Sequence, residues 1–442
     1  MFLPQSVSQC MDTLEQAGFE VYAVGGCVRD FLLGITPHDY DLCSNASPQQ
    51  LCQVFSQFSL VRSGEKHGTI GVVTDEGVVE ITTFRTEGDY QDGRHPGWVR
   101  FVSTIEEDLS RRDFTINAMA YSPRTGLVDP WGGQADLQQK ILRTVGDPTL
   151  RFTEDALRIL RGVRFAVRFD LTPQPETLDA MFQLAPLMDN LARERVFDEL
   201  CKLLPLVNAE DLLYYTPVLV QAIPELAPCV GFQQHSPHHA YDVFTHIAHV
   251  VEATPQSLSL RWAALLHDAG KPSCYILGND GRGHFPDHAR HSAQIADSVL
   301  RRLKASTALR EEVVFLVSHH MTPIEPEKRI VLRRLSRYGV DRLLALLDLQ
   351  MADMGSKGTG ISNGMGHFRQ IRQLIADLLA EQACLQIKDL AVDGSELIAL
   401  GYTPGPALGR CLEWLLNLVQ DDELPNEKDV LLQAAKSYQN LE

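Results

Sequence analysis

Two acidic residues near the start of the chain have the spacing of a metal site. Asp39 and Asp41 flank Tyr40, shortly after the glycine pair Gly25 and Gly26. In an extended segment side chains alternate between faces, so the two carboxylates point the same way. Like charges this close are costly unless a cation lies between them, and Mg²⁺ prefers carboxylate and phosphate oxygens. A bare Asp-x-Asp is usually a solvated surface pair, but its position after a glycine turn favours a Mg²⁺ site.

The glycine turn could hold the phosphates of a nucleotide. It runs from Gly25 to Asp30, between an apolar strand and a helical segment. Glycines let backbone N–H groups approach a phosphate closely, and Arg29 can add a bidentate contact. Taken alone, a glycine turn without any ligand is the commoner case, so the interpretation depends on the residues around it.

Further charged residues fit the same nucleotide hypothesis. Glu80 is a carboxylate in an otherwise apolar strand, where it could face water or complete a two-metal phosphoryl-transfer site as a third ligand or base. Arg112, Asp113 and Asn117 lie together at an expected helix start. They could form a solvated helix cap. They could also bind a nucleotide, with the arginine on phosphate and the Asp and Asn on ribose hydroxyls.

Seven segments, met in one order along the chain, carry a family resemblance. They are Gly25–Asp30, Asp39–Asp41, Glu80–Arg85, Arg111–Ala118, Asp129–Gly133, Arg151–Phe165 and Ala192–Val196. Together they resemble the class II tRNA nucleotidyltransferases and poly(A) polymerases, whose head belongs to the polymerase β-like superfamily. The resemblance implies a head that binds two Mg²⁺ and adds nucleotides to a tRNA 3′ end. It implies that Asp39 and Asp41 are metal ligands, that Glu80 is catalytic, and that nucleotide is bound by Gly26, Arg29 and Arg112.

The segment Glu154–Arg168 predicts an amphipathic helix with arginines on one arc. Asp155 and Arg158 are three positions apart and would be neighbours on that helix. A solvated charged face is the usual explanation. Alternatively, Asp155 accepts a hydrogen bond from an exocyclic amine while Arg158 donates to a ring nitrogen or carbonyl. Cytosine and adenine both present an amine beside an acceptor, so one such pair could accept C and A and reject G and U.

The resemblance assigns this base-reading role to Glu154, Asp155 and Arg158, with Arg161 and Arg164 as further nucleotide contacts. The implied reaction is in-line attack of the tRNA 3′-hydroxyl on the α-phosphate of CTP or ATP, with pyrophosphate leaving. The implied partners are therefore tRNA, CTP and ATP. A-adding or CC-adding tRNA nucleotidyltransferases and poly(A) polymerases remain alternatives. We expect the polar segment Arg85–Phe101 to be a mobile loop, and the resemblance implies that a chain with such a loop adds CCA or A.

A second set of residues suggests another metal site further along the chain. An adjacent pair, His267 and Asp268, has His246 before it and Asp353 far downstream, and two more histidines lie between, His288 and His320. A lone histidine on a helix is more often a packed core residue than a ligand. Imidazoles mixed with carboxylates suit Mn²⁺, Ni²⁺, Fe or Zn²⁺ and metal-activated water for phosphoester hydrolysis.

This set resembles the HD-domain metal-dependent phosphohydrolases over Ser236 to Asp353. The resemblance implies that His246, His267, Asp268 and Asp353 are core ligands of a divalent metal, which could also be Mg²⁺, and that His288 and His320 bind a second ion. An alternative function is that the chain is mainly an HD phosphohydrolase whose head binds RNA. An HD domain in a nucleotidyltransferase can also be only a structural body.

The patterns predict an α+β protein whose mixed-sheet head is followed by helices almost to the end. Short β-branched runs predict strands at Val21–Val24, Thr69–Val73 and Val78–Thr83. After Pro148 the texture changes to long periodic segments. We expect four domains: a head at 1–147, a helical neck at 148–232, an HD domain at 233–360 and a helical tail at 361–442.

Composition limits the classes of partner. The 442 residues carry 40 Lys and Arg against 57 Asp and Glu, a net charge of −17, which argues against a uniformly basic surface that coats nucleic acid. The cations instead gather on segments such as Lys328–Arg337. No apolar run is long enough for a membrane span, and no signal peptide is evident, so we expect a cytoplasmic protein. The sequence does not indicate an oligomeric state.

Overall fold

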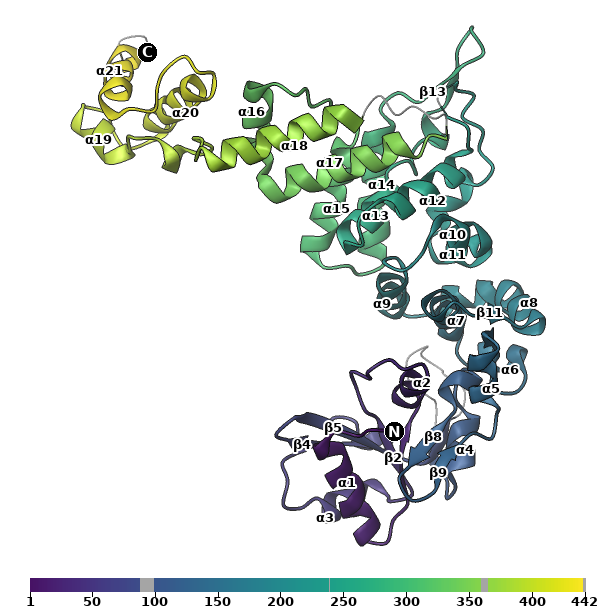
Figure 1. Ribbon diagram of the computed structural model, residues 1–442. Helices are drawn as coiled ribbons and strands as arrows, with labels where there is room; N and C mark the ends of the chain where they lie inside the picture. The colour runs from purple at the N-terminus through teal and green to yellow at the C-terminus, as the bar shows by residue number, and fades with distance from the viewer. Residues whose placement is uncertain (88–98, 238, 359–364, 440–442) are drawn as a thin grey trace. The chain divides into compact units, whose positions relative to one another are not determined.

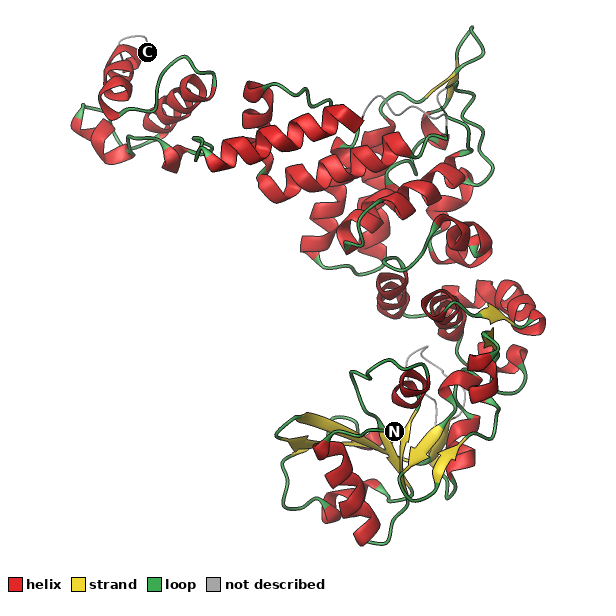
Figure 2. Ribbon diagram, in the orientation of Figure 1, coloured by secondary structure: helices red, strands yellow, loops and turns green. Residues whose placement is uncertain are grey.

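The structure is a computed structural model that describes residues 1–87, 99–237, 239–358 and 365–439 (Figure 1). The described chain divides into two compact units. The first contains Met1–Ala227 and Arg301–Ala305, and the second contains Pro228–Leu300 and Ser306–Glu442. The first unit carries the mixed sheet and the second is almost wholly helical, which confirms the predicted α+β class (Figure 2). No helix of the described residues is long and apolar enough to cross a membrane.

A seven-stranded sheet forms the base of the first unit, in the strand order β3-β4-β5-β2-β1-β8-β9. Its strands are β1 (Val21–Val24), β2 (Leu42–Ser44), β3 (Leu60–Val61), β4 (Thr69–Thr74), β5 (Gly77–Thr83), β8 (Ala120–Ser122) and β9 (Gly126–Val128). β2 and β5 are parallel, and the other neighbours are antiparallel. The helices around it are α1 (Gln5–Gln16), α2 (Gly26–Leu32), α3 (Pro48–Val54) and α4 (Ile105–Ser110). The three predicted strands are thus confirmed within one residue at each end.

The segment expected to be a mobile loop has paired ends. β6 (Arg85–Glu87) and β7 (Val99–Phe101) form a separate antiparallel ribbon in which Arg85 faces Phe101. The expectation of a loop over the whole of Arg85–Phe101 is therefore wrong at both ends. Its centre, residues 88–98, lies outside the described residues.

Short helices follow the sheet in the first unit. They are α5 (Gly133–Gln138), α6 (Pro148–Glu154), α7 (Leu157–Phe169), α8 (Pro175–Leu184), α9 (Arg193–Leu203), α10 (Ala209–Tyr214) and α11 (Thr216–Ala222). β10 (Ile141–Leu142) pairs in parallel with β11 (Thr172–Pro173), so this region is not purely helical. The single helix predicted over Glu154–Arg168 is wrong. The helix is interrupted at Asp155, whose backbone is extended (φ −145°, ψ 101°). The Asp155 carboxylate accepts a hydrogen bond from the Leu157 N–H at 3.0 Å.

The second unit is a helical body with a helical tail. Its helices are α12 (Val243–Ala253), α13 (Leu258–Leu266), α14 (His288–Arg302), α15 (Thr307–His319), α16 (Lys328–Tyr338), α17 (Val340–Gly355), α18 (Met365–Ala380), α19 (Gly394–Ala399), α20 (Pro406–Gln420) and α21 (Lys428–Gln439). One small hairpin joins β12 (Ile276–Leu277) to β13 (Gly283–His284). The last three helices bury a core of their own, which includes Leu397, Cys411 and Leu415.

Candidate active site

A polar cavity of about 440 Å³ lies in the first unit between the sheet and α7. Most of the nucleotide-binding residues predicted from the sequence line it: Gly26, Arg29, Arg112, Asp113, Asn117, Asp155, Arg158, Arg161 and Arg164. Asp41 is also in its wall, together with Arg111, Arg168 and Arg195. A cavity with this many guanidinium groups is suited to a ligand that carries several negative charges.

The glycine turn closes one side of this cavity. Gly25 has φ +73° and ψ −122°, and α2 begins at the next residue. The positive φ favours glycine, and a Cβ at Gly25 would lie 2.8 Å from the Arg112 guanidinium, which would have to shift. Arg112 is held by Asp108 at 3.2 Å. The turn therefore brings backbone N–H groups and one arginine to the same wall.

Arg29 lies in the interior of the unit, with only 5% of its surface exposed. It donates to Asp30 at 2.6 and 2.8 Å and to the Asn117 side-chain oxygen at 2.5 Å. Its flat face lies over the ring of Phe169 at 4.4 Å. These contacts link α2 to α7, so Arg29 fixes the shape of the cavity as well as lining it.

Two acidic residues lie side by side where β2 begins next to the middle of β5. Asp41 directly precedes Leu42, Glu80 directly precedes Ile81, and Leu42 pairs with Ile81 in the β2–β5 register. Neighbours in register share a face, so Asp41 and Glu80 project to the same side of the sheet. Both carboxylates line a second cavity of about 860 Å³, together with Asp39. Asp41 borders both cavities and therefore connects them.

Poor hydration raises the pKa of Asp41, and the nearby Asp39 adds to that rise, while Arg112 opposes it. Carboxylates that repel each other in this way have a reason to bind a cation. Carboxylate oxygens are the donors that Mg²⁺ prefers, so the donor chemistry of Asp39, Asp41 and Glu80 fits that ion. Asp39 and Asp41 lie in the segment just before β2.

Asp113 is buried and binds both Asn117, next to the sheet, and Arg161 of α7. Arg161 contacts its carboxylate at 2.6 Å, and the Asn117 amide donates to it at 3.0 Å. Burial alone would raise the pKa of Asp113, but Arg161 and these hydrogen bonds lower it to about 2. Asp113 therefore stays ionised and holds Arg161 against the cavity wall.

Asp155 and Arg158 both line the cavity, but each side chain has another charged partner. Because the helix breaks at Asp155, Arg158 turns to Glu154 at 2.7 Å and to the carbonyls of Arg151 and Arg111 at 3.2 and 3.1 Å. The partner of Asp155 is Arg195, forty positions further along the chain. The charged arc of α7 is also not a solvated face, since Arg158 and Arg164 are only 8% and 7% exposed.

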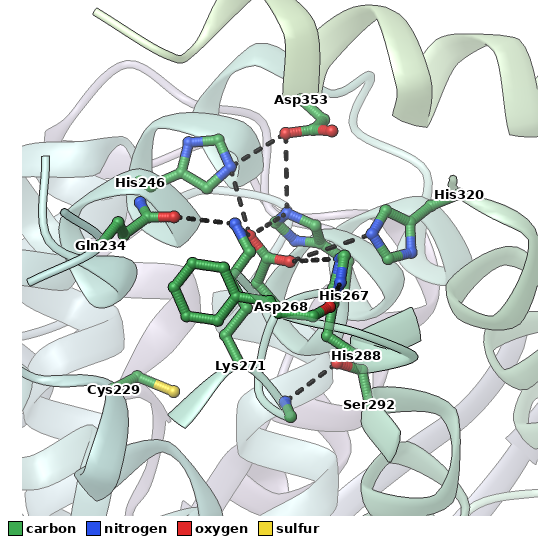
Figure 3. A network of polar contacts seen from close by, with 12 residues as sticks. Cys229, Gln234, His246, His267, Asp268, Lys271, His288, Ser292, His320 and Asp353 are labelled. Carbon is green, nitrogen blue, oxygen red and sulfur yellow. Dashed lines mark hydrogen bonds and ion pairs between the residues drawn. The ribbon is translucent and has the colours of Figure 1, made fainter. Parts of the chain in front are cut away.

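Six residues of the second predicted set converge in the second unit (Figure 3). Asp268 lies at their centre. Its Oδ2 is 3.2 Å from His267 Nε2 and 3.5 Å from His246 Nε2. Its Oδ1 is 3.4 Å from His288 Nε2 and 3.9 Å from His320 Nε2. Asp353 completes the group, with its Oδ1 2.9 Å from His246 Nε2.

The four imidazoles are held in the same way. Each has its Nδ1 on a backbone carbonyl, at 3.2 Å for His246, 2.7 Å for His267, 2.9 Å for His288 and 2.7 Å for His320. A carbonyl only accepts, so Nδ1 must donate and each neutral ring has a lone pair on Nε2. Histidine ligands of metals are held in this way. Burial lowers the pKa of His320 to about 4, which keeps that ring neutral.

The inner atoms of this cluster fit a metal ion. Among the described residues, His267 Nε2, His320 Nε2 and Asp268 Oδ1 are buried without a hydrogen-bond partner, and Asp268 Oδ2 has the Lys271 ammonium at 2.6 Å. Burial would raise the pKa of Asp268, but His267 and Lys271 hold it well below its usual range. Within the described ranges, two sets of three have ligand atoms within 4.8 Å of one another: His246 with His267 and Asp268, and Asp268 with His288 and His320. One carboxylate therefore joins two sets, and an N/O donor set of this kind suits a transition-metal ion.

Family models match three parts of the chain. The poly A polymerase head domain matches residues 21–143. An RNA- and SrmB-binding site of polymerase A matches residues 170–229, and the tRNA nucleotidyltransferase domain 2 matches residues 285–435. The first match contains the glycine turn and the three carboxylates of the predicted metal site, Asp39, Asp41 and Glu80.

Curated relatives are similar over nearly the whole chain. The CCA-adding enzyme of Latilactobacillus sakei subsp. sakei is 32% identical over 438 residues, which cover 96% of this chain and 96% of the relative. The CCA-adding enzyme of Streptococcus gordonii is 32% identical over 97% of each chain. This chain belongs to the CCA-adding enzyme family.

Solved CCA-adding enzymes have the same fold. The crystal structure of the Bacillus stearothermophilus CCA-adding enzyme in complex with CTP matches with a TM-score of 0.72 and 27% identity, and covers 100% of this chain and 99% of that one. The Thermotoga maritima CCA-adding enzyme complexed with tRNA matches at a TM-score of 0.58 and 21% identity, which supports the fold alone. The predicted nucleotidyltransferase family is confirmed. The individual site residues and the HD assignment stay predictions.

Two residues of this chain contact the predicted sites but were not predicted from the sequence. Arg195 binds Asp155, and the Ala192–Val196 segment of the family resemblance was the signal that contained it. Lys271 contacts Asp268 at 2.6 Å, and its position three residues after Asp268 could have indicated it.

Proposed function

We propose that the chain is a template-independent CCA-adding tRNA nucleotidyltransferase, which adds C, C and A from CTP and ATP to the tRNA 3′ end. The observation that carries this proposal is the similarity of nearly the whole chain to CCA-adding enzymes. The arginine-rich cavity beside Asp41 supports it, because a nucleoside triphosphate carries the matching charge. Because tRNA, CTP and ATP meet in the cytoplasm, we propose that compartment for the activity.

In this proposal the nucleotide spans the cavity. Its triphosphate lies by the glycine turn and Arg112, and its base meets Asp155 and Arg158. Asp155 accepts from the amine of cytosine or adenine, and Arg158 donates to the neighbouring ring acceptor. Arg161 and Arg164 are held by Asp113 and Glu199, so the wall is rigid before the nucleotide enters.

Asp39 and Asp41 are proposed to hold divalent metal, with Mg²⁺ as the ion and Glu80 as a third carboxylate. Bound Mg²⁺ would lower the pKa of the attacking 3′-hydroxyl and neutralise charge on the triphosphate. The protein orients the α-phosphate for in-line attack by the tRNA 3′-hydroxyl. The arginines of the cavity stabilise the negative charge of the leaving pyrophosphate.

The test uses tRNA transcripts that end before CCA, after the first C, and after the second C. Each is incubated with CTP, with ATP or with both, and the products are resolved on a sequencing gel. Full CCA addition that is lost in Asp39→Ala and Asp41→Ala supports the proposal, with Asp12→Ala in α1 as a matched control. Addition of A alone or CC alone would reassign the subtype, and long A tracts would identify a poly(A) polymerase.

A second function is favoured by the His–Asp cluster of the second unit. We propose a metal-dependent phosphohydrolase of the HD type, with His246, His267, Asp268 and Asp353 as core ligands and His288 and His320 completing a second set. The bound metal would supply a nucleophilic hydroxide from water. A cavity of about 230 Å³ opens onto Asp268, and Lys271 and Lys357 in its wall could bind a phosphate.

Phosphatase and cyclic phosphodiesterase assays with Mn²⁺, Ni²⁺, Zn²⁺ and Mg²⁺ test this second function. We expect a metal-dependent activity that His267→Ala abolishes and Asp39→Ala leaves unchanged. Absence of hydrolysis with every ion, in a protein that still adds CCA, would refute it and leave the cluster with a structural role.

A further inference from the structure

The carboxylate proposed to read the base is held by a second arginine. Arg195, in the first turn of α9, contacts Asp155 through both of its terminal nitrogens, at 2.8 Å to Oδ2 and 3.3 Å to Oδ1. The side chain of Asp155 is 8% exposed and that of Arg195 is 21% exposed. Both line the arginine-rich cavity. A two-point contact of this kind fixes the plane of the carboxylate as well as its position.

These contacts determine which acceptor sites of Asp155 remain. A carboxylate oxygen has two lone-pair directions. Oδ1 accepts from the Leu157 N–H at 3.0 Å and from Arg195, which uses both of its directions. Oδ2 accepts from Arg195 at 2.8 Å. One direction on Oδ2 is thus left for a ligand in the cavity.

The direction of that remaining acceptor determines which base can pair with it. Cytosine and adenine present an amine that donates to it, whereas uracil and guanine present a carbonyl oxygen at the corresponding edge. Two acceptors that face each other in a closed site leave both unsatisfied, which is costly. Discrimination therefore depends on a carboxylate that cannot rotate away from the base.

We propose that Arg195 is a specificity-determining positioning residue that orients Asp155 for the exocyclic amine of cytosine or adenine. The inference rests on the proposed CCA-adding function. Arg195 acts through Asp155. Its removal leaves the carboxylate held on one side only, by the Leu157 N–H. The consequence is a loss of choice between bases rather than a uniform loss of nucleotide binding.

Arg193 provides a matched control. It is the first residue of the same helix and two positions from Arg195, but its guanidinium donates to the Asp189 carbonyl at 3.0 Å. It is not among the residues that line the cavity. Arg193→Met and Arg195→Met therefore remove the same charge from the same helix, and only the second affects the Asp155 contact.

The experiment measures kcat and KM for CTP, ATP, UTP and GTP on tRNA substrates that end before and within CCA. We expect Arg195→Met to reduce the preference for CTP over UTP and for ATP over GTP by roughly tenfold to hundredfold, mainly through KM. Arg193→Met should keep the wild-type preference. Arg195→Lys should recover part of it, since an ammonium can contact only one oxygen well. In an Asp155→Asn background, Arg195→Met should change the preference little further.

Three results separate the explanations. Equal losses for all four nucleotides in Arg195→Met would overturn the proposal and make Arg195 a general nucleotide contact or a structural residue. Unchanged preference in Arg195→Met, with relaxed preference in Asp155→Asn, would also overturn it while the proposed function stands. No C or A addition by the wild-type protein would overturn the proposed function itself. If Arg195→Met fails to fold, calorimetric binding of CTP and UTP to Arg195→Lys gives the same comparison, and equal CTP-to-UTP ratios in that variant and wild type would refute the role.

Discussion

Asp268 joins two sets of ligand atoms, so one substitution there should remove two metal ions. An ion bound about 2.1 Å from an imidazole nitrogen and a carboxylate oxygen keeps those two atoms about 3.0 to 3.4 Å apart. The distances from Asp268 to His267 and His288 are 3.2 and 3.4 Å, and the distance to His246 is 3.5 Å. These three pairs therefore need almost no movement. His320, at 3.9 Å, would have to move by a few tenths of an ångström.

Relative to the wild-type protein, Asp268→Asn should bind two ions fewer and His320→Ala one ion fewer. The assay is equilibrium dialysis of the full chain against Mn²⁺, followed by elemental analysis. At a thousandfold excess over its dissociation constant, one bound ion adds about 4 kcal/mol to the free energy of unfolding. Wild-type protein should thus gain more thermal stability with Mn²⁺ than Asp268→Asn does.

Asp287→Asn is the matched control, because Asp287 is an exposed carboxylate directly before His288. It should bind as many ions as the wild type and gain the same stability. Undiminished metal content in Asp268→Asn would refute the shared-ligand reasoning. CCA addition by each variant serves as the readout that the chain has folded.

Three further perturbations test the packing of the first unit. Asp113→Asn should lower the free energy of unfolding by about 2 kcal/mol at pH 7, since the pKa of about 2 lies below the value of 3.8 in the unfolded chain. The stabilisation by ionised Asp113 is complete above pH 3.8 and declines as the pH falls toward 2. The pH dependence of the urea midpoint measures it. Gly133→Ala puts a Cβ 2.2 Å from a backbone carbonyl oxygen and should cost roughly 3 kcal/mol by urea unfolding, whereas Gly366→Ala, with open space around it, should be tolerated. Arg164→Met leaves Glu199 buried without its 2.6 Å partner and should cost about 3 kcal/mol, and a loss below 1 kcal/mol would contradict that reasoning.

Local patterns were sufficient for three of the seven strands of the sheet, and they indicated most of the residues that line the cavity. β-branched runs predicted β1, β4 and β5 because strand preference and burial agree there. The interruption of the helix at Asp155 could not be predicted, because the apolar periodicity continues through it. The only local cause is the Asp155 carboxylate, which accepts a hydrogen bond from the Leu157 N–H. The pairing of Asp155 with Arg195 is a contact across forty positions, and nothing in a single sequence specifies which distant cation meets a given carboxylate.

The second cluster shows the opposite case. The residue types His246, His267, Asp268 and Asp353 were a sufficient signal for a convergent group, and the structure brings them together with His288 and His320. The carbonyl partners of the rings could not have been predicted, because they depend on where α13 and α15 end. Which ions and substrates the group binds stays a prediction.

The carbonyl groups that hold the four imidazole rings also determine how an ion could enter the folded protein. Each ring already has Nδ1 on a carbonyl and Nε2 turned toward Asp268 or Asp353, so uptake requires neither a ring flip nor the transfer of a proton from one ring nitrogen to the other. The rotamer entropy of these side chains is therefore lost when the chain folds, and little of it is lost when an ion binds. Such a cage would exchange one ion for another as a rigid receptor, and its occupancy would follow the supply of metal around it.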